Sequence, residues 1–223
     1  MLTKYELARY IDHSILPPEL TYDEVRKSIK TAIDLKCKIV CVTGQRVKMA
    51  HEMTRGSETA VGAVAGFPLG CHTTESKVFE TIEAFKNGAV EIDTVLNVGA
   101  MKSGDYETVY NDVKAIVNCS PCLVKVILET CLLTKDEIAK ASRICSDAGV
   151  GYVKTSTGYS LRGGTLEDIE IMKANIDTSK VGLKAAGGLK TLKQCEDFIK
   201  AGCTRLGMSR SKSIIAELDK KNK

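Results

Sequence analysis

The chain has little of what builds several common kinds of binding surface. Aromatic residues make up 5% of its 223 positions, and tryptophan is absent. Single-stranded nucleic acids are bound largely by stacking their bases on aromatic rings, so this composition argues against such a platform. The net charge is only +4, from 32 basic and 28 acidic residues. So small an excess, spread along the chain, gives little support to a nucleic-acid partner of any kind.

Long apolar segments and linkers are missing too. No run approaches the roughly 18 uncharged apolar residues of a membrane-spanning helix, and the first residues carry no apolar targeting signal. No stretch rich in proline, glycine or serine divides the chain, and 43% of the residues are apolar, which is enough for one full core. We therefore expect a single domain over residues 1–223, in a cytoplasmic protein that binds no membrane.

The nine cysteines are many for such a chain, and their number is odd. Most occupy apolar positions of the pattern, which is typical of small buried side chains in a reducing compartment. These are Cys37, Cys41, Cys145, Cys195 and Cys203. The pair Cys119 and Cys122 forms a CxxC motif, but no second pair of ligands accompanies it. The motif also lies before a strand instead of at a helix N-terminus, so we expect neither a metal site nor a redox centre.

Short apolar runs alternate with amphipathic segments along the whole chain. The runs begin near residues 11, 39, 61, 90, 123, 152, 181 and 204. After a short helix at 4–10, segments with apolar residues every three or four positions predict helices at 75–87, 106–117, 134–148, 166–175 and 192–201. Eight strands alternating with helices, on a period of about 28 residues, predict parallel strands joined by helical crossovers.

A closed (β/α)8 barrel, known as a TIM barrel, fits this count of strands in the α/β class. An open doubly wound sheet is the alternative. It predicts a phosphate-binding loop after the first strand, and Asp12-His13-Ser14 is not such a loop.

Three lysines interrupt apolar strand runs at matching places. Lys154 follows Lys125 by 29 residues (154 − 125), and Lys184 follows Lys154 by 30 (184 − 154). Asp93 falls on the same repeat, 32 residues before Lys125 (125 − 93). Lysine is among the residues least often buried, because its ammonium group loses hydration there. One such lysine is more typical of a strand end whose ammonium reaches water, but four charged residues on successive strands predict a shared site.

A cluster of this kind can turn an amine into a nucleophile. Two neighbouring ammonium groups do not both stay charged easily, so one pKa falls, while Asp93 offsets part of the charge. An amine that is neutral near pH 7 attacks a carbonyl and forms a Schiff base, which favours breaking or making the adjacent C–C bond. Side chains alternate between the two faces of a strand, so Asp93 points into the barrel if Ile92 packs on the helices.

Glycine-rich segments follow the last three apolar runs, at 155–158, 185–188 and 206–209. Glycines let backbone N–H groups approach an anion, and barrels often bind phosphate in the loops after strands 7 and 8. We therefore predict a small phosphorylated aldehyde or sugar as the substrate.

These motifs together resemble one family over almost the whole chain. Val153-Lys154-Thr155-Ser156-Thr157-Gly158 and Lys184-Ala185-Ala186-Gly187-Gly188, in this order, are similar to the 2-deoxyribose-5-phosphate aldolases, which are class I aldolases on a (β/α)8 barrel. Residues 11–14, 90–93, 124–130 and 205–209 agree with the same pattern.

The resemblance implies a reaction and an assembly. The reaction is reversible cleavage of 2-deoxy-D-ribose 5-phosphate to D-glyceraldehyde 3-phosphate and acetaldehyde, in deoxyribose phosphate catabolism. It implies a lysine Schiff base, no metal and no cofactor. It also implies a homodimer or homotetramer.

The resemblance further implies roles for single residues. Lys154 is the Schiff-base nucleophile, and Lys184 is the neighbour that lowers its pKa and helps to move protons. Asp93 donates and accepts protons together with Lys125, through water, and Asp12 organises the lysines. Small residues surround the phosphate: Gly158, Gly187, Gly188, Gly207 and Ser209.

Three departures from the family pattern stand out. Arg210 replaces a small hydroxyl residue of many members, and Tyr159 stands where some members carry a basic residue. The chain ends in Lys-Lys-Asn-Lys, whereas some relatives end in a tyrosine tail that assists proton transfer. Two alternatives stay open: a class I aldolase for another phosphorylated donor, and a noncatalytic barrel that binds sugar phosphates.

Overall fold

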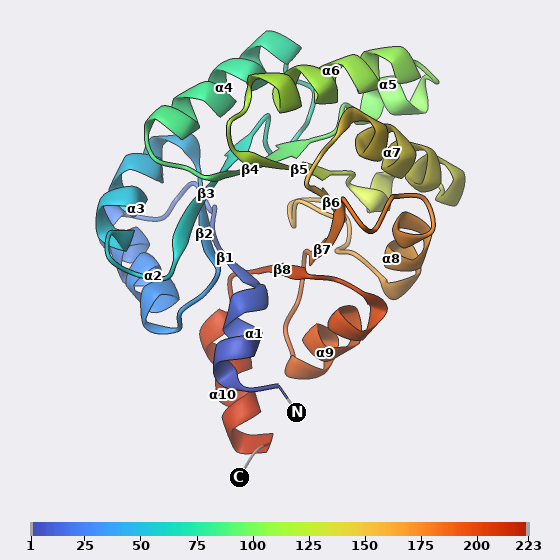
Figure 1. The fold of residues 1–223 in the computed structure, drawn as a ribbon. Helices are drawn as coiled ribbons and strands as arrows, with labels where there is room; N and C mark the ends of the chain where they lie inside the picture. Colours follow the sequence, from blue (N-terminus) through green and yellow to red (C-terminus); the bar gives the residue numbers. More distant parts are fainter. Residues whose placement is uncertain (1, 222–223) are drawn as a thin grey trace.

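The computed structural model describes residues 2–221 and contains one closed barrel of eight parallel strands (Figure 1). The strands follow one another around the ring in chain order, and the last one, β8, pairs with the first, β1. They are β1 (Ile11–Ile15), β2 (Ile39–Val42), β3 (Ala60–Ala65), β4 (Glu91–Val95), β5 (Leu123–Ile127), β6 (Tyr152–Lys154), β7 (Gly182–Ala186) and β8 (Arg205–Met208). The predicted barrel is confirmed, and the open sheet is excluded because β1 and β8 close the ring.

The helices form an outer layer around the strands (Figure 1). They are α1 (Lys4–Tyr10), α2 (Tyr22–Asp34), α3 (Val47–Thr54), α4 (Thr74–Lys86), α5 (Val98–Lys102), α6 (Tyr106–Cys119), α7 (Lys135–Ala148), α8 (Leu166–Lys173), α9 (Leu192–Ala201) and α10 (Ser211–Lys221), with short 3-10 turns η1 (Gly44–Arg46) and η2 (Thr130–Leu132). Every helix expected from the sequence is present within two residues of its expected bounds. Helices α1 and α10, the first and last helices of the described residues, lie side by side (Figure 1).

Local sequence signals explain where the elements start and stop. Helix α7 begins after Thr134, whose hydroxyl accepts a hydrogen bond from the Glu137 N–H while the Glu137 carboxylate accepts one from the Thr134 N–H. The helix ends at Gly149, which has a φ of 89° that a residue with a side chain rarely adopts. On β4, Ile92 packs outward in the main core, and Asp93 therefore points inward, as the alternation predicted.

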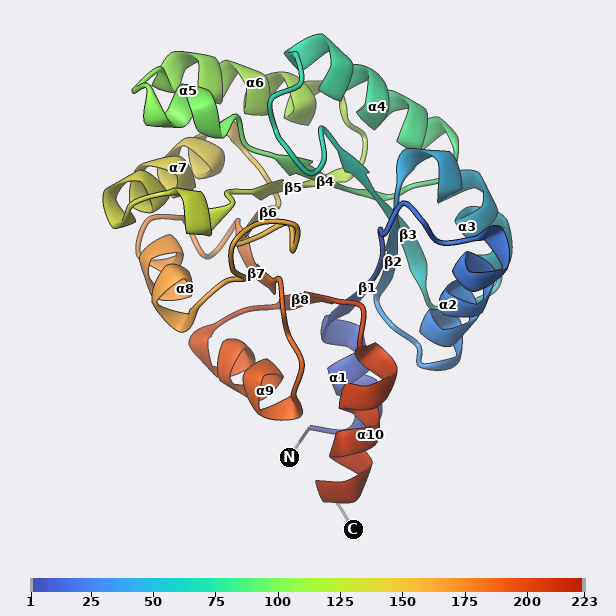
Figure 2. The same ribbon diagram turned by 180° about the vertical axis from the view of Figure 1, so that it is seen from behind.

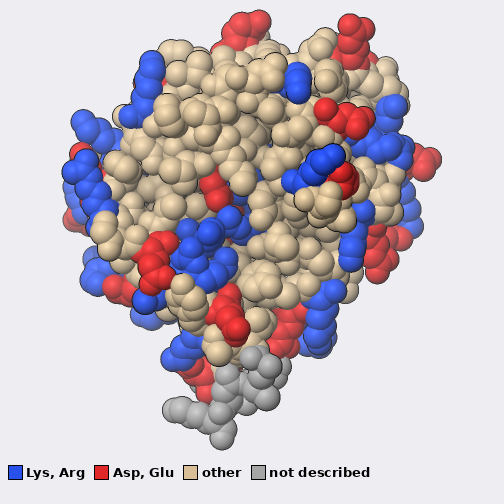
Figure 3. All heavy atoms as spheres, viewed as in Figure 1, with Lys and Arg blue, Asp and Glu red and all other residues tan. Residues whose placement is uncertain are grey.

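The loops after the carboxyl ends of the strands form one end of the barrel. The segment between β6 and α8 curls across the middle of this opening (Figure 2). On the face drawn in Figure 3, Lys and Arg side chains are interspersed with Asp and Glu, and broad uncharged areas separate them. Within residues 2–221, none of the helices is both long and apolar enough to cross a bilayer.

The cysteines behave as the apolar pattern indicated. All five that were predicted to be buried are buried, and all nine are free thiols. Burial raises the pKa of Cys37, Cys195 and Cys203 to about 12. Cys119 ends α6 and Cys122 directly precedes β5, and both are half-buried. Burial raises the pKa of both thiols, which is the opposite of what a reactive pair requires.

Candidate active site

Three lysines and two aspartates form one ion-pair network inside the barrel. Asp93 Oδ1 accepts a hydrogen bond from Lys125 Nζ at 2.9 Å, and its Oδ2 accepts from Lys154 Nζ and Lys184 Nζ, each at 2.7 Å. Asp12 accepts from Lys125 at 3.0 Å and also from Lys184. The structure therefore brings together all five charged residues singled out in the sequence. Asp93 and Lys125 are in direct contact in this network.

The strand register makes the three lysines unequal. Asp93 on β4 lies opposite Lys125 on β5, and Lys154 on β6 lies opposite Lys184 on β7. Lys154, however, pairs with Ile127 and not with Lys125, so Lys125 sits two residues nearer the amino end of its strand. Lys154 is the last residue of β6 and lines the cavity above the network, whereas Lys125 and Lys184 are fully buried.

The same inequality appears in the pKa values. Burial lowers the pKa of Lys154, Asp93 opposes this, and the nearby Lys184 charge lowers the pKa further. Burial alone would lower the pKa of Lys184 as well, but Asp12 and Asp93 outweigh it and raise that pKa. Asp12, Asp93 and Glu91 likewise raise the pKa of Lys125 well above its usual value against the effect of burial. Lys154 is thus the lysine of this network that most readily loses its proton, with burial a larger cause than Lys184.

The two aspartates keep their charge. Burial would raise the pKa of Asp93, but Lys125, Lys154 and Lys184 hold it well below its usual value. The pKa of Asp12 is lowered in the same way by Lys125, Lys184 and Arg205. A buried amine beside an ionised carboxylate can add to a carbonyl and exchange protons with that carboxylate.

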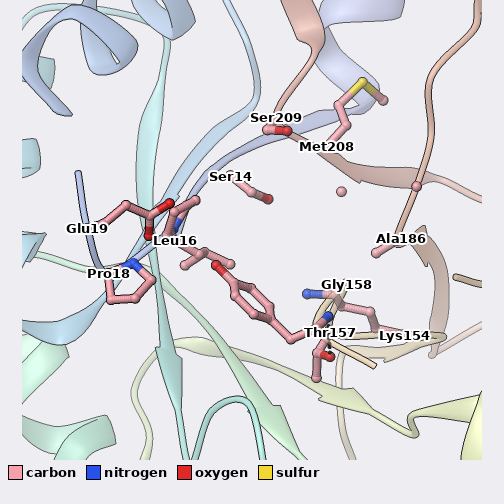
Figure 4. A pocket seen from close by; sticks show the side chains of 15 residues that line it. Ser14, Leu16, Pro18, Glu19, Lys154, Thr157, Gly158, Ala186, Met208 and Ser209 are labelled. Carbon is pink, nitrogen blue, oxygen red and sulfur yellow. Dashed lines mark hydrogen bonds between the residues drawn. The ribbon is translucent and has the colours of Figure 1, made fainter. Parts of the chain in front are cut away.

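A cavity of about 380 Å³ opens above Lys154 at the carboxyl ends of the strands. In Figure 4, Lys154, Thr157 and Gly158 lie on one side of this cavity and Glu19 and Pro18 on the other. The five residues expected around a phosphate all line it: Gly158, Gly187, Gly188, Gly207 and Ser209.

Gly187 is the glycine in this wall whose replacement the structure resists most clearly. Its φ is 86°, and an added Cβ would lie 2.8 Å from the Cα of Gly163. The β7 loop and the loop after β6 therefore touch backbone to backbone, and a side chain at position 187 would separate them.

The loop after Lys154 is held by buried polar contacts that the sequence reasoning missed. Glu129 is buried with a φ of 55°, and its carboxylate accepts from the Thr157 N–H at 3.3 Å and from the Thr157 hydroxyl. Thr155 Oγ1 donates to the Ala186 carbonyl at 3.2 Å and accepts from the Ala186 N–H at 3.1 Å. A left-handed conformation is unusual for a residue other than glycine, so Glu129 marks a constrained position beside the site.

The departures from the family pattern fall in different places. Tyr159 lines the cavity, and its ring stands nearly perpendicular to that of Phe67, with centroids 5.4 Å apart. The two rings tie the β6 loop to the β3 loop. Arg210 is exposed and does not line the cavity. Of the Lys-Lys-Asn-Lys segment at the end of this chain, Asn222 and Lys223 lie outside the described residues.

Two further charged residues contact the network from the amino ends of the strands. Glu91 and Arg205 are the first residues of β4 and β8, and neither was singled out in the sequence. A signal was available for Glu91: it stands two residues before Asp93 and so shares its inward face.

His13, from the same motif as Asp12, is buried between Ser211 and Ser28, and burial lowers its pKa to about 4. Among residues 2–221, no three His, Cys, Asp or Glu side chains are grouped to hold a metal ion.

Comparisons with known proteins show the family to which this chain belongs. Residues 7–208 match the family model described as DeoC/LacD family aldolase. The chain is 43% identical over 215 residues to a deoxyribose-phosphate aldolase of Clostridium perfringens, with 96% of each chain covered.

Two solved structures extend the comparison. The structure titled "QR15, an Aldolase" superposes with a TM-score of 0.91 at 37% identity, covering 97% of both chains. The tetrameric deoxyribose phosphate aldolase of Aeropyrum pernix superposes with a TM-score of 0.90 at 27% identity, covering 97% of this chain and 92% of that one. The chain therefore belongs to the DeoC/LacD family of aldolases.

Proposed function

We propose that this protein reversibly cleaves 2-deoxy-D-ribose 5-phosphate to D-glyceraldehyde 3-phosphate and acetaldehyde, with Lys154 as the nucleophile. The observation that carries the proposal is the Lys154 amine, which lines the cavity while burial lowers its pKa. Lys125 and Lys184 are fully buried, and their pKa values are raised. The names of the relatives support the choice of substrate.

The chemistry follows from the neighbours of Lys154. Its neutral amine adds to the C1 aldehyde of the open sugar, and loss of water leaves a Schiff base that accepts the electrons of the breaking C2–C3 bond. The C3 hydroxyl loses its proton and becomes the aldehyde of the departing glyceraldehyde phosphate. The remaining two-carbon enamine takes a proton at carbon, and water then releases acetaldehyde and restores the amine.

Asp93 is the group placed to carry these protons. Its Oδ2 is 2.7 Å from Lys154 Nζ, and its pKa is held low, so it is ionised and ready to accept. Lys184 shares the same oxygen at 2.7 Å and supplies a proton in return, while Lys125 and Asp12 keep both groups in place. The backbone around Gly187, Gly188, Gly207 and Gly158, with Ser209, would hold the phosphate without a metal or cofactor.

The test is reductive trapping of the imine. Incubation with acetaldehyde and borohydride should add one ethyl group to Lys154, located by peptide mass spectrometry, and Lys154→Met should abolish both the label and turnover. An ethyl group found on Lys125 or Lys184 instead would refute the assignment.

Two further comparisons separate the alternatives. An aldolase for another donor would use dihydroxyacetone phosphate in place of acetaldehyde. A noncatalytic barrel would lose affinity for the sugar phosphate in Lys154→Met, whereas the aldolase should largely keep that affinity and lose turnover.

We also propose that the protein is a cytoplasmic homodimer or homotetramer that acts in deoxyribose phosphate catabolism. The tetrameric Aeropyrum pernix relative supports self-association. Light scattering on the purified protein measures the assembly directly, and a monomer at micromolar concentration would contradict it.

A further inference from the structure

A buried pair of opposite charges lies under the lysine network, at the amino ends of the strands. Arg205 Nη2 donates to Glu91 Oε1 at 2.9 Å, and both side chains are only 8% exposed. The pair is joined to the network at two points. The other Glu91 oxygen, Oε2, lies 2.6 Å from Lys125 Nζ, and Arg205 Nη1 lies 3.2 Å from Asp12 Oδ1.

The remaining strands bring no further charge to this cluster. Around the barrel, β2 contributes Cys41, whose pKa burial raises to about 11 so that the thiol is neutral. On β6, the Tyr152 ring faces the Arg205 guanidinium, whose Cζ lies 5.6 Å from the ring centroid. The inward residues of β3, Gly62 and Val64, are uncharged.

The cluster therefore has a countable charge. Its carboxylates are Asp12, Glu91 and Asp93, and its cations are Lys125, Lys154, Lys184 and Arg205. With every lysine protonated there is one positive charge in excess, and when Lys154 is a free amine the charges balance. An uncompensated charge is unfavourable inside a protein, so the balance favours the free amine at Lys154.

Glu91 and Arg205 enter this balance although neither lines the cavity. We propose that they are positioning residues that set the protonation of Lys154 through Lys125 and Asp12, and that they act in opposite directions. Glu91 favours the ammonium form of Lys154, and Arg205 favours the free amine. The inference rests on the proposed role of Lys154 as nucleophile, and it concerns residues that never touch the substrate.

The pH dependence of kcat/KM tests this inference, because its acid limb reports the loss of the free amine. Glu91→Gln removes a negative charge, so the acid limb should move down by about one pH unit, within the range of one buried charge. Arg205→Met removes a positive charge, so the limb should move up by about one pH unit. The double variant loses one charge of each sign and should return close to wild type.

Two control variants separate charge from packing. Arg205→Lys keeps the positive charge and should keep the wild-type limb, even if the variant is less stable. Asp112→Asn removes a buried carboxylate that lies 2.6 Å from Lys77, between α4 and α6 and outside the barrel interior. It should destabilise the fold and leave the limb where it is.

A second readout is the pH dependence of ethyl labelling of Lys154 by acetaldehyde and borohydride, which follows the amine itself. The inference is overturned if the acid limbs of Glu91→Gln and Arg205→Met move in the same direction, or do not move, while the label still falls on Lys154. A label on another lysine refutes the proposed function instead. If one of the single variants does not fold, the double variant is compared with the single variant that does. Its acid limb should lie about one pH unit above that of Glu91→Gln, or about one pH unit below that of Arg205→Met.

Discussion

Asp93→Asn removes the carboxylate that three ammonium groups share. Asp93 is 0% exposed and accepts hydrogen bonds from Lys125, Lys154 and Lys184 at 2.7–2.9 Å. An asparagine keeps one acceptor oxygen and turns a donor NH2 toward the remaining lysines. Removing one partner of a buried ion pair lowers the free energy of unfolding by about 3–5 kcal/mol. At about 2–4 °C per kcal/mol for a chain of this size, Tm should fall by about 6–20 °C near pH 7.

The stability lost in Asp93→Asn should become smaller as the pH rises. In the variant, the buried Lys154 ammonium has lost its carboxylate partner, so its pKa is lower than in the unfolded chain. The unfolded state then binds more protons, so the stability of the variant rises with pH. The wild-type contribution of Asp93 behaves differently: its pKa is depressed on folding, so that contribution is present above the unfolded pKa and is lost only on acidification. The gap in Tm between the two proteins should therefore narrow from about pH 7 to about pH 9.5.

Thermal unfolding followed by circular dichroism measures this gap at both pH values. Asp34→Asn is the matched control, since Asp34 pairs with Lys30 on the exposed surface of α2 and its loss should leave Tm nearly unchanged. A gap of less than about 2 °C at neutral pH would show that Asp93 is not the electrostatic centre of the network, because it corresponds to under about 1 kcal/mol. A gap that is equal at both pH values would refute the proton linkage. Turnover should fall by about a hundredfold or more, as expected when a proton-transfer group is lost.

Two further substitutions test the cavity wall and the outer layer. Gly187→Ala would force a Cβ to within 2.8 Å of Gly163, so kcat/KM for the phosphorylated sugar should fall about tenfold or more, while unphosphorylated deoxyribose is affected less; equal losses would contradict the phosphate role. Lys77→Met would leave the buried Asp112 carboxylate without its ammonium partner at 2.6 Å and should lower the urea-derived free energy of unfolding by about 3–5 kcal/mol. An unchanged midpoint would mean that this pair contributes nothing.

The barrel could be predicted because its signals are local and repeated. Alternating strands and helices on a nearly constant period allow few arrangements other than a parallel sheet covered by helices. Closure of the ring was the uncertain step, and it depends on the contact between β1 and β8, residues almost a whole chain apart. The inward direction of Asp93 followed from the alternation of side chains on β4.

The contacts around the site could not be read from the chain in the same way. Glu129 lies beside Thr157, and Tyr159 lies against Phe67, because separate loops converge at one end of the barrel. No local pattern encodes such a convergence. Arg205 was overlooked for a related reason: a single arginine at the start of a strand is ordinary until its partner, Glu91, is known to lie across the barrel.

The sequence by itself determined that Lys125, Lys154 and Lys184 would gather with Asp93, because similar spacings of 29 to 32 residues on successive βα units return each residue to the same interior. Only the tertiary structure decided that the lysines differ. Strand register places Lys154 at the cavity with one carboxylate partner, and gives Lys125 and Lys184 two or more. The proton affinity of a buried amine depends on how many opposite charges surround it and on how much water remains, and both are properties of the folded barrel.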